Sequence, residues 1–204
     1  MDALVAASRD AGVQDERVLD AIAAVPRVDF VPDEHADLAD LDTPIPIPHD
    51  QVTTQPSLVA RMVEALGLAG DERVLEIGTG YGWQTALLAR LAHEVYSVER
   101  FADLAETARR HLADYEYVTV VVGDGSAGLP EHAPYDAILV AAAYTSVPEP
   151  LADQLAQRGR LVQPLGPGGA EDVVLFEKRD GELRRVRSII GAHFVRLHGR
   201  HGFP

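Results

Sequence analysis

Apolar positions recur along this chain in two alternating patterns, and the order of the patterns predicts an α/β sheet. Near-continuous apolar runs predict strands, and apolar residues at helical spacing between them predict amphipathic helices. The strands are expected at 73–77, 94–98, 118–122, 135–141 and 160–164, and the helices at 83–92, 102–113 and 149–157. Strands that are apolar on both faces are typical of a parallel sheet covered by helices.

The chain closes in a different pattern. The β-rich runs 172–179 and 182–190 flank Asp180-Gly181, which is a strong signal for a hairpin. We therefore predict an α/β fold with a mostly parallel, Rossmann-like sheet of seven strands, helices on both faces and a C-terminal antiparallel hairpin.

The first third of the chain is rich in proline. Helical spacing predicts a short helix over 15–25. The prolines between 26 and 56 exclude a central strand, because proline donates no backbone hydrogen bond, so we expect an ordered loop or lid outside the core. A helix then begins at Pro56 and ends at Gly67. We predict a single domain, 1–204, with a helical and proline-rich extension over 1–67 and the sheet core over 68–204.

Composition narrows the choice of partners and compartment. A net charge of −14 and a pI near 4.8 argue against a nucleic-acid partner. The chain has no cysteine, no apolar run of membrane-spanning length and no leader-like start. We therefore expect a cytoplasmic protein that is not associated with membranes. We also expect a monomer. Five arginines and no acids lie between Leu183 and Pro204; this end either meets an anionic peptide or is a solvated edge strand and tail.

A glycine-rich turn follows the first predicted strand of the sheet. Gly78, Gly80 and Gly82 come after Glu76, and Glu99 ends the next strand. Such a turn lets backbone approach a nucleoside, while a carboxylate after the second strand accepts both ribose hydroxyls. The spacing differs from the dinucleotide pattern G-x-G-x-x-G, and an acidic residue before the turn repels phosphate but suits the ammonium group of an amino acid. The pattern therefore favours S-adenosylmethionine over NAD.

A third strand end carries Gly123-Asp124-Gly125, where Asp124 can accept a hydrogen bond from an adenine amino group. Ligands of open α/β sheets bind beyond the carboxyl ends of the strands. The three strand ends together predict a nucleoside cradle and the fold of a class I methyltransferase.

More specific motifs flank this cradle. Thr43-Pro-Ile-Pro-Ile47 and Gln51-Val-Thr-Thr-Gln-Pro56 lie ahead of the sheet, and Phe194-Val-x-Leu197 lies near the end. With Glu76-Ile-Gly-Thr-Gly80, Val98-Glu-Arg100, Gly123-Asp-Gly125 and Pro134-Tyr-Asp-Ala-Ile138, they occur in the order of one family. From about Pro26 to Leu197 the chain resembles the protein-L-isoaspartate O-methyltransferases, which repair proteins by methylating the abnormal carboxylate of aged aspartyl or asparaginyl residues.

The resemblance implies roles for individual residues. The implied cofactor-binding residues are Gln51, Val52, Thr53, Glu76, Gly78, Thr79, Gly80, Gly82, Glu99, Arg100, Asp124 and Gly125. The implied substrate groove consists of Thr54, Tyr144, His193, Phe194 and Val195, and its substrate is a protein or peptide bearing a free isoaspartyl or aspartyl carboxylate. The chain departs from the family pattern at Thr54 (usually serine), at Tyr81-Gly82-Trp83, and at Tyr144 and Arg196, near which the family tends to have proline.

In such a reaction the enzyme mainly has to position the carboxylate relative to the methyl donor. A carboxylate is ionised at neutral pH, so it attacks a sulfonium methyl group without a general base. Thr54 is the candidate catalytic residue that orients this nucleophile, although a threonine at this point also suits a helix N-cap. His193, His198 and His201 lack carboxylates at ligand spacing, so we expect no metal.

Three other functions remain open to test. The first is a family member that methylates an aspartate of one dedicated, ribosomally made peptide, after which the ester collapses to a succinimide. The second, an RNA or small-molecule methyltransferase, is disfavoured because Ala141-Ala-Ala-Tyr144 is not the Asn/Asp-Pro-Pro-aromatic motif of amine methylation. The third is a non-catalytic protein that keeps the nucleoside cradle.

Overall fold

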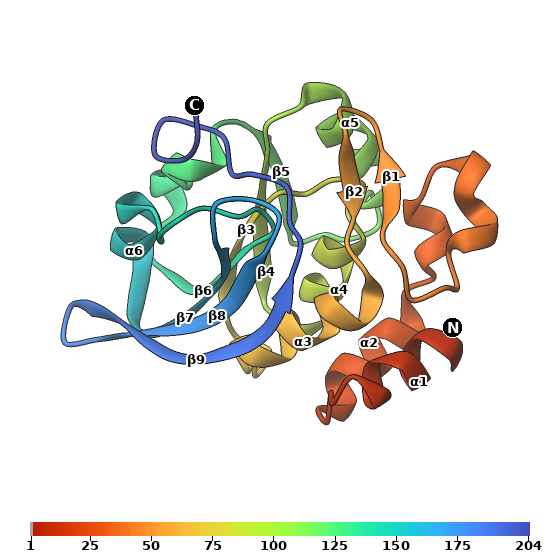
Figure 1. The fold of residues 1–204 in the computed structure, drawn as a ribbon, viewed down its shortest axis with the longest axis horizontal. Helices are drawn as coiled ribbons and strands as arrows, with labels where there is room; N and C mark the ends of the chain where they lie inside the picture. Colours follow the sequence, from red (N-terminus) through yellow and green to blue (C-terminus); the bar gives the residue numbers. More distant parts are fainter. Residues whose placement is uncertain (1) are drawn as a thin grey trace.

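A seven-stranded sheet lies at the centre of the protein, as the sequence predicts (Figure 1). The computed structural model describes residues 2–204. The strands of the sheet are β3 (Arg73–Ile77), β4 (Glu94–Glu99), β5 (Val118–Val122), β6 (Tyr135–Val140), β7 (Leu155–Leu165), β8 (Glu171–Arg179) and β9 (Glu182–Ala192).

The strand order is β5-β4-β3-β6-β7-β8-β9. The pairs from β5 to β7 are parallel, and β8 and β9 add the predicted antiparallel hairpin. From β3 the chain moves outward to β4 and β5, then returns to β6 on the other side of β3. The topological switch therefore lies beside β3, where open α/β sheets bind their ligands.

Helices cover both faces of the sheet, also as predicted. They are α1 (Asp2–Asp10), α2 (Glu16–Ala24), α3 (Pro56–Leu66), α4 (Trp83–Leu91), α5 (Ala102–His111) and α6 (Glu149–Gln154). Alternate strand residues point to opposite faces. Val74 and Val95 pack with side chains of α1 to α5, whereas Leu75 and Val98 belong to a second cluster that includes Leu151 of α6.

The proline-rich segment is more ordered and more buried than expected. It contains the short 3-10 helices η1 (Arg27–Phe30) and η2 (Asp33–Leu38) and an antiparallel pair of strands, β1 (Ile45–Ile47) and β2 (Gln51–Thr53). The expectation that this segment lies outside the core is wrong, since Phe30, Val31, Ile45 and Ile47 are buried. Proline and isoleucine alternate in β1, so Pro46 is exposed while its apolar neighbours face inward.

Two other elements differ from the prediction. Helix α1 was not predicted, and α6 ends at Gln154 rather than near residue 157, because Leu155 already pairs with Tyr135 as the first residue of β7. One apolar cluster runs from Leu4 in α1 to Ile189 in β9, which supports a single domain. Among residues 2–204, no helix has the length and apolar character needed to span a membrane.

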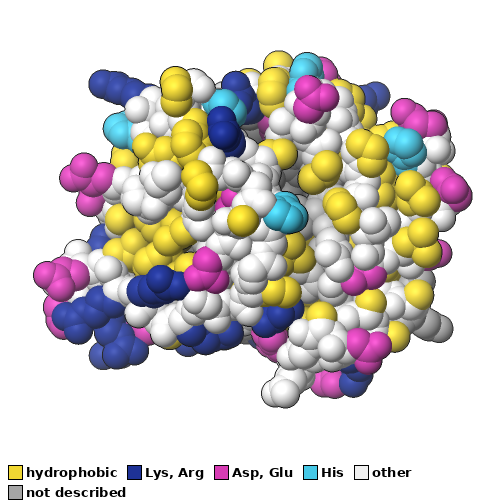
Figure 2. All heavy atoms as spheres, in the orientation of Figure 1, with side chains coloured by type: hydrophobic (Ala, Val, Ile, Leu, Met, Phe, Trp, Pro, Cys, Tyr) yellow, Lys and Arg dark blue, Asp and Glu magenta, His cyan; other side chains and the backbone are white. Residues whose placement is uncertain are grey.

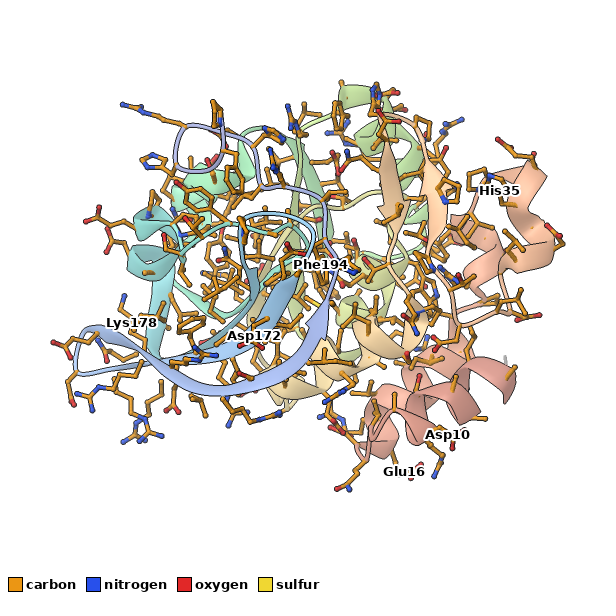
Figure 3. The ribbon with its side chains drawn as sticks, in the orientation of Figure 1. Asp10, Glu16, His35, Asp172, Lys178 and Phe194 are labelled. Carbon is orange, nitrogen blue, oxygen red and sulfur yellow. The ribbon has the colours of Figure 1, made fainter. Side chains whose placement is uncertain are left out.

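The β8–β9 hairpin carries a group of basic side chains at one end of the molecule (Figure 2). In Figure 3, Lys178 lies near the tip of this hairpin and Asp172 lies farther along it. The side chain of Arg185 pairs with Asp172, and Arg184 lies 3.6 Å from Asp180. Neighbouring acids therefore balance part of the arginine-rich run.

Candidate active site

The glycine turn between β3 and α4 presents bare backbone at the carboxyl end of the central strands. Gly78, Gly80 and Gly82 have φ angles of +95°, +55° and +97°, which strain any residue with a Cβ. A Cβ on Gly82 would also lie 2.9 Å from Leu112 Cδ1. The Gly78 N–H donates to the Val98 carbonyl at 2.9 Å and ties the turn to β4.

A cavity of about 880 Å³, including its open mouth, lies in front of this turn. Its walls are the β1–β2 pair, the glycine turn with the end of β4, and the segment that follows β9; Figure 2 shows the surface hollowed between the first and last of these. The predicted cofactor residues that line it are Gln51, Val52, Thr53, Gly78, Thr79, Gly80, Gly82, Glu99, Arg100 and Gly125. Ten of the twelve predicted cofactor residues therefore lie around one cavity.

Glu99 ends β4 with its carboxylate at the cavity wall. Oε2 accepts the Gly80 N–H at 2.9 Å, and Oε1 accepts the Phe101 N–H at 3.1 Å. Each carboxylate oxygen has a further lone pair, so both can also accept a hydroxyl group of a ligand. Glu99 therefore shapes the glycine turn and offers two acceptors to a diol such as ribose.

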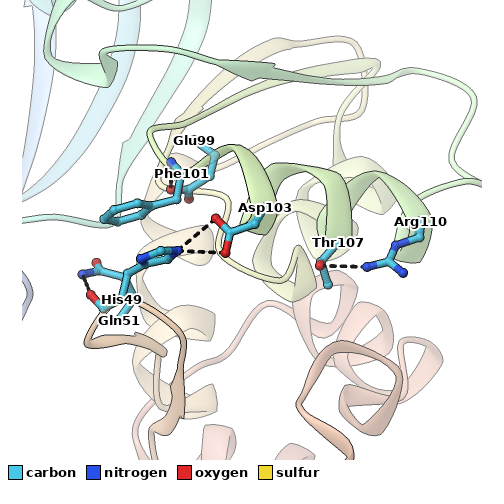
Figure 4. Close-up of polar contacts among 7 residues, drawn as sticks. All are labelled: His49, Gln51, Glu99, Phe101, Asp103, Thr107 and Arg110. Carbon is cyan, nitrogen blue, oxygen red and sulfur yellow. Dashed lines mark hydrogen bonds and ion pairs between the residues drawn. The ribbon is translucent and has the colours of Figure 1, made fainter.

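The turn between β1 and β2 is held against the start of α5 beside the cavity (Figure 4). The His49 ring stacks on Phe101 with ring centroids 4.1 Å apart, and its Nε2 lies 2.8 Å from Asp103 Oδ2. Gln51 Nε2 donates to the His49 carbonyl at 2.8 Å. These contacts connect the predicted lid to the strand end that carries Glu99.

Arg27 organises the other side of the β1–β2 pair. The residue is only 2% exposed, and its guanidinium donates to two loop carbonyls at 2.9 and 3.1 Å, to Thr53 Oγ1 at 2.8 Å and to the Thr54 carbonyl at 3.3 Å. Burial lowers the pKa of Arg27 to about 10, and the nearby charge of Asp42 opposes this shift. The side chain thus stays cationic at neutral pH and fixes the backbone around Thr54.

A second cavity, about 970 Å³ with its open mouth, adjoins the first. It is lined by α3, the end of β9 and the segment His193–Val195; Figure 3 shows Phe194 where this segment leaves the hairpin. The residues that line both cavities are Val52, Thr54, Ala141 and Val195. Thr54 therefore lies where a ligand in one cavity meets a ligand in the other.

Comparison with known proteins identifies the family of this chain. The sequence model described as Protein-L-isoaspartate(D-aspartate) O-methyltransferase matches residues 1–202. Protein-L-isoaspartate O-methyltransferase of Myxococcus xanthus is 49% identical over 194 residues, which is 93% of this chain and 92% of the relative. The chain belongs to the protein-L-isoaspartate O-methyltransferase family.

Other members and solved structures agree. The Alkalilimnicola ehrlichii protein of the same name is 49% identical over 200 residues, with 96% of this chain and 90% of the relative covered. A solved protein-L-isoaspartate O-methyltransferase superposes with a TM-score of 0.88 at 30% identity and covers 98% of this chain and 67% of that one. A Plasmodium falciparum structure, described as a complex with S-adenosyl-L-homocysteine, has the same fold, with a TM-score of 0.78, 22% identity and 96% coverage of each chain.

Glu76, a predicted cofactor-binding residue, lies beneath the glycine turn. Its carboxylate is fully buried and does not line the cavity. Gln84 Nε2 donates to it at 2.8 Å, and the hydroxyls of Thr85 and Ser97 also donate to it. Glu76 thus ties β3 to β4 and α4 beneath the glycine turn, and its expected contact with the ammonium group of a cofactor stays a prediction.

Two further predicted site residues, Tyr144 and Asp124, also lie outside the cavity linings, and their roles stay predictions. Tyr144, expected in the substrate groove, lines neither cavity, and its ring packs edge-on against Phe203 with centroids 5.0 Å apart. Asp124 is likewise absent from the cavity lining, and its carboxylate accepts from Ser126 and from the Arg200 N–H. Across residues 2–204, no group of three or more histidine, aspartate or glutamate side chains is placed to hold a metal ion.

Sequence analysis missed residues that shape the site without touching a ligand. Arg27 lies in no recognisable sequence motif. The only sequence signal for the hydrogen bonds around Glu76 was the position of Thr85 and Ser97 on the inner faces of α4 and β4. His49 and Asp103 are far apart in sequence. The cavity lining does include Trp83, whose Nε1 donates to the Val25 carbonyl at 3.2 Å.

Proposed function

We propose that this protein transfers a methyl group from S-adenosylmethionine to the free carboxylate of L-isoaspartyl residues in damaged proteins and peptides. The observation that carries the proposal is the meeting of the two cavities at Thr54. One cavity has the glycine turn and Glu99 of a nucleoside site, and the other has an extended segment suited to a peptide. Membership in the family supports both assignments.

The first cavity is proposed to hold the cofactor. Glu99 would accept the ribose hydroxyls, the glycine turn would bind the nucleoside through its backbone, and Gln51 and Thr53 of the β1–β2 pair would also hold the cofactor. The Plasmodium falciparum structure, described as a complex with S-adenosyl-L-homocysteine, supports a donor of this class. The donor supplies an electrophilic methyl group on a sulfonium.

Positioning is the main contribution of this chain's own residues to the reaction. The acceptor carboxylate is ionised at neutral pH, so a new O–C bond forms as the S–C bond breaks and no proton has to move. Holding the two reactants in line supplies much of the rate enhancement. Thr54, with its carbonyl fixed by Arg27, is proposed to orient the carboxylate through its hydroxyl.

Selectivity for isoaspartate requires that the enzyme detect one extra methylene in the substrate backbone, which fixed polar groups do better than apolar contacts. The segment from His193 to Val195 is held on both sides: the Phe194 N–H donates to Glu171 Oε2 at 2.8 Å, and the Ala143 N–H donates to the Val195 carbonyl at 2.8 Å. We propose that this fixed backbone reads the substrate chain.

A pair of peptides tests the proposal. The peptides share one sequence and differ only in an isoaspartyl or an ordinary aspartyl linkage; mass spectrometry follows the added methyl group with S-adenosylmethionine present. Methylation of the isoaspartyl peptide is the expected result. Methylation of the ordinary aspartyl peptide alone would instead indicate the dedicated-peptide function, and methylation of neither would contradict the proposal.

We also propose a monomer that acts in the cytoplasm without a nucleic-acid partner. The net charge of −14 supports the absence of a nucleic-acid partner, and the absence of cysteine supports the cytoplasmic location. Size-exclusion chromatography with light scattering tests the monomer, and a retardation assay with RNA tests the absence of nucleic-acid binding.

A further inference from the structure

Arg61 of α3 lines the second cavity, which is proposed to hold the peptide. Its Nη2 donates to the Ile189 carbonyl of β9, and this contact fixes the side chain in the wall. An arginine has five N–H donors in a planar fork, so most of them remain available to a ligand. Among residues 2–204, no aspartate or glutamate forms an ion pair with Arg61. The wall therefore holds a cation in a set position without a carboxylate partner.

The rest of the cavity wall supplies no opposing charge. In the part of the chain that the structure describes, no aspartate or glutamate lines this cavity, although the chain has 32 of them. Asp42 and Glu171 contact lining residues, but their carboxylates already accept hydrogen bonds. Asp42 accepts from Gln55 Nε2 and from the Ser57 N–H, each at 2.8 Å, and Glu171 accepts from the Phe194 N–H at 2.8 Å. Charge complementarity therefore favours an anionic ligand in this cavity.

The strand that holds Arg61 in place adds positive charge beside the cavity. Arg184 and Arg185 of β9 have acidic partners. Arg187 is exposed and, within residues 2–204, forms no ion pair. Ile190 of the same strand lines the cavity. Of the two roles that the sequence leaves open for the arginine-rich run, contact with an anionic peptide therefore agrees with the position of this strand.

The spacing along α3 separates Arg61 from the reacting centre. Thr54 lies just before the helix, and Arg61 is five residues into it from Pro56, which is a rise of about 7.5 Å at 1.5 Å per residue. An extended peptide advances about 3.3 Å per residue. A substrate carboxylate that reaches Arg61 while the reacting carboxylate lies at Thr54 therefore belongs to a residue about two or three positions away.

We propose that Arg61 binds a second carboxylate of the substrate, so that this protein prefers isoaspartyl peptides that carry an aspartate or glutamate about two or three residues from the methylated group. The inference rests on the proposed function for the reaction itself. Arg61 is then a specificity-determining residue, which contributes to binding of the peptide and takes no part in methyl transfer.

A set of isoaspartyl peptides tests this preference. Each carries either glutamate or glutamine at one of the three positions before or after the isoaspartyl residue, and kcat and KM are measured for every pair. At one position, about two or three residues away, glutamate should lower KM by about fivefold and leave kcat unchanged, as expected for a partly exposed charge pair. The preference should shrink as salt is added, because salt screens such a pair. Equal KM values for glutamate and glutamine at all positions would overturn the proposal.

Variants assign the preference to a side chain. Arg61→Met should abolish it, and Arg61→Lys should keep part of it, because the charge remains and the planar fork is lost. Arg90→Met, which removes an exposed arginine at the end of α4, is the matched control and should keep the full preference. The preference is a ratio of two peptides within one protein, so a loss of folded protein cancels. If Arg61 only held β9, Arg61→Met would slow both peptides equally and leave the ratio unchanged, and the proposal would fail.

His193 is the other ionisable side chain that lines the cavity. His193→Gln should leave the preference for glutamate in place. Loss of the preference in His193→Gln but not in Arg61→Met would assign it to the histidine and overturn the role of Arg61.

The same peptides separate the two proposals. If the wild type methylates every isoaspartyl peptide with no preference for glutamate, the proposed function stands and only the role of Arg61 is wrong. If the wild type methylates none of them, the proposed function fails and the inference fails with it.

Discussion

Replacing Glu76 by glutamine should make the stability of this protein less dependent on pH. The Glu76 carboxylate is fully buried, and burial raises its pKa from 4.5 to about 7. Hydrogen bonds from Ser97, Thr85 and Gln84 oppose this rise, and the charge of Glu99 adds to it. The wild type therefore holds an acid whose ionisation near neutral pH is resisted by its surroundings.

The sign follows from the proton affinities of the two states. A carboxyl group with a raised pKa binds its proton more tightly when folded, so its contribution to stability is full below the unfolded pKa of about 4.5 and is lost as the pH rises towards about 7. A difference of about 2.5 pKa units, at about 1.4 kcal/mol per unit, corresponds to about 3.5 kcal/mol.

Glutamine reproduces the neutral form of Glu76. Its carbonyl accepts as the acid does, and the hydroxyls of Thr85 and Ser97 can turn to accept from its amide. The variant should match the wild type below about pH 4 and exceed its free energy of unfolding by up to about 3.5 kcal/mol near about pH 8.

Urea denaturation across this pH range, read from the fluorescence of Trp83, measures the difference. Glu131→Gln changes an exposed carboxylate in the same way and serves as the matched control. A constant difference between Glu76→Gln and the wild type from pH 5 to 8 would refute the argument from burial, as would a variant that is less stable at the higher pH.

Other substitutions separate structural roles from catalytic ones. Arg27→Met leaves buried carbonyls without donors and should cost about 3 kcal/mol or more of stability in urea denaturation. Gly82→Ala forces a Cβ into a positive-φ position and should weaken S-adenosylhomocysteine binding by about tenfold in calorimetry. Thr54→Val should lower kcat for an isoaspartyl peptide by about tenfold while Thr54→Ser retains most of it, with the affinity for cofactor unchanged in both. His49→Asn should raise the KM for S-adenosylmethionine by about threefold, because the lid loses its contact with Asp103, while the melting temperature changes little.

The sheet was predictable because its signals are local. Each core strand is a short apolar run, and the Asp180-Gly181 turn specifies the hairpin between β8 and β9. The glycine turn and Glu99 were predictable for the same reason, since both follow strand ends that meet at one edge of the sheet. Their place in the cavity lining follows directly from the parallel order of β3 and β4.

What sequence reasoning missed depends on contacts between distant residues. The proline-rich segment folds inward because one buried cation, Arg27, satisfies carbonyls on both sides of β1 and β2, and nothing in the local pattern marks an arginine as buried. The hydrogen-bond network around Glu76 was not predicted, because its three donors come from the separate elements β4 and α4.

The shared wall between the two cavities explains how one small domain can couple a cofactor to a peptide. Thr54 comes from the N-terminal extension, Ala141 from the end of β6 and Val195 from the segment after β9, so both ends of the chain must pack against the sheet before the reacting centre exists. A change at these positions alters both cavities together. A change at Glu99, which lines only the first cavity, alters one, and this difference allows binding of donor and acceptor to be separated by kinetics.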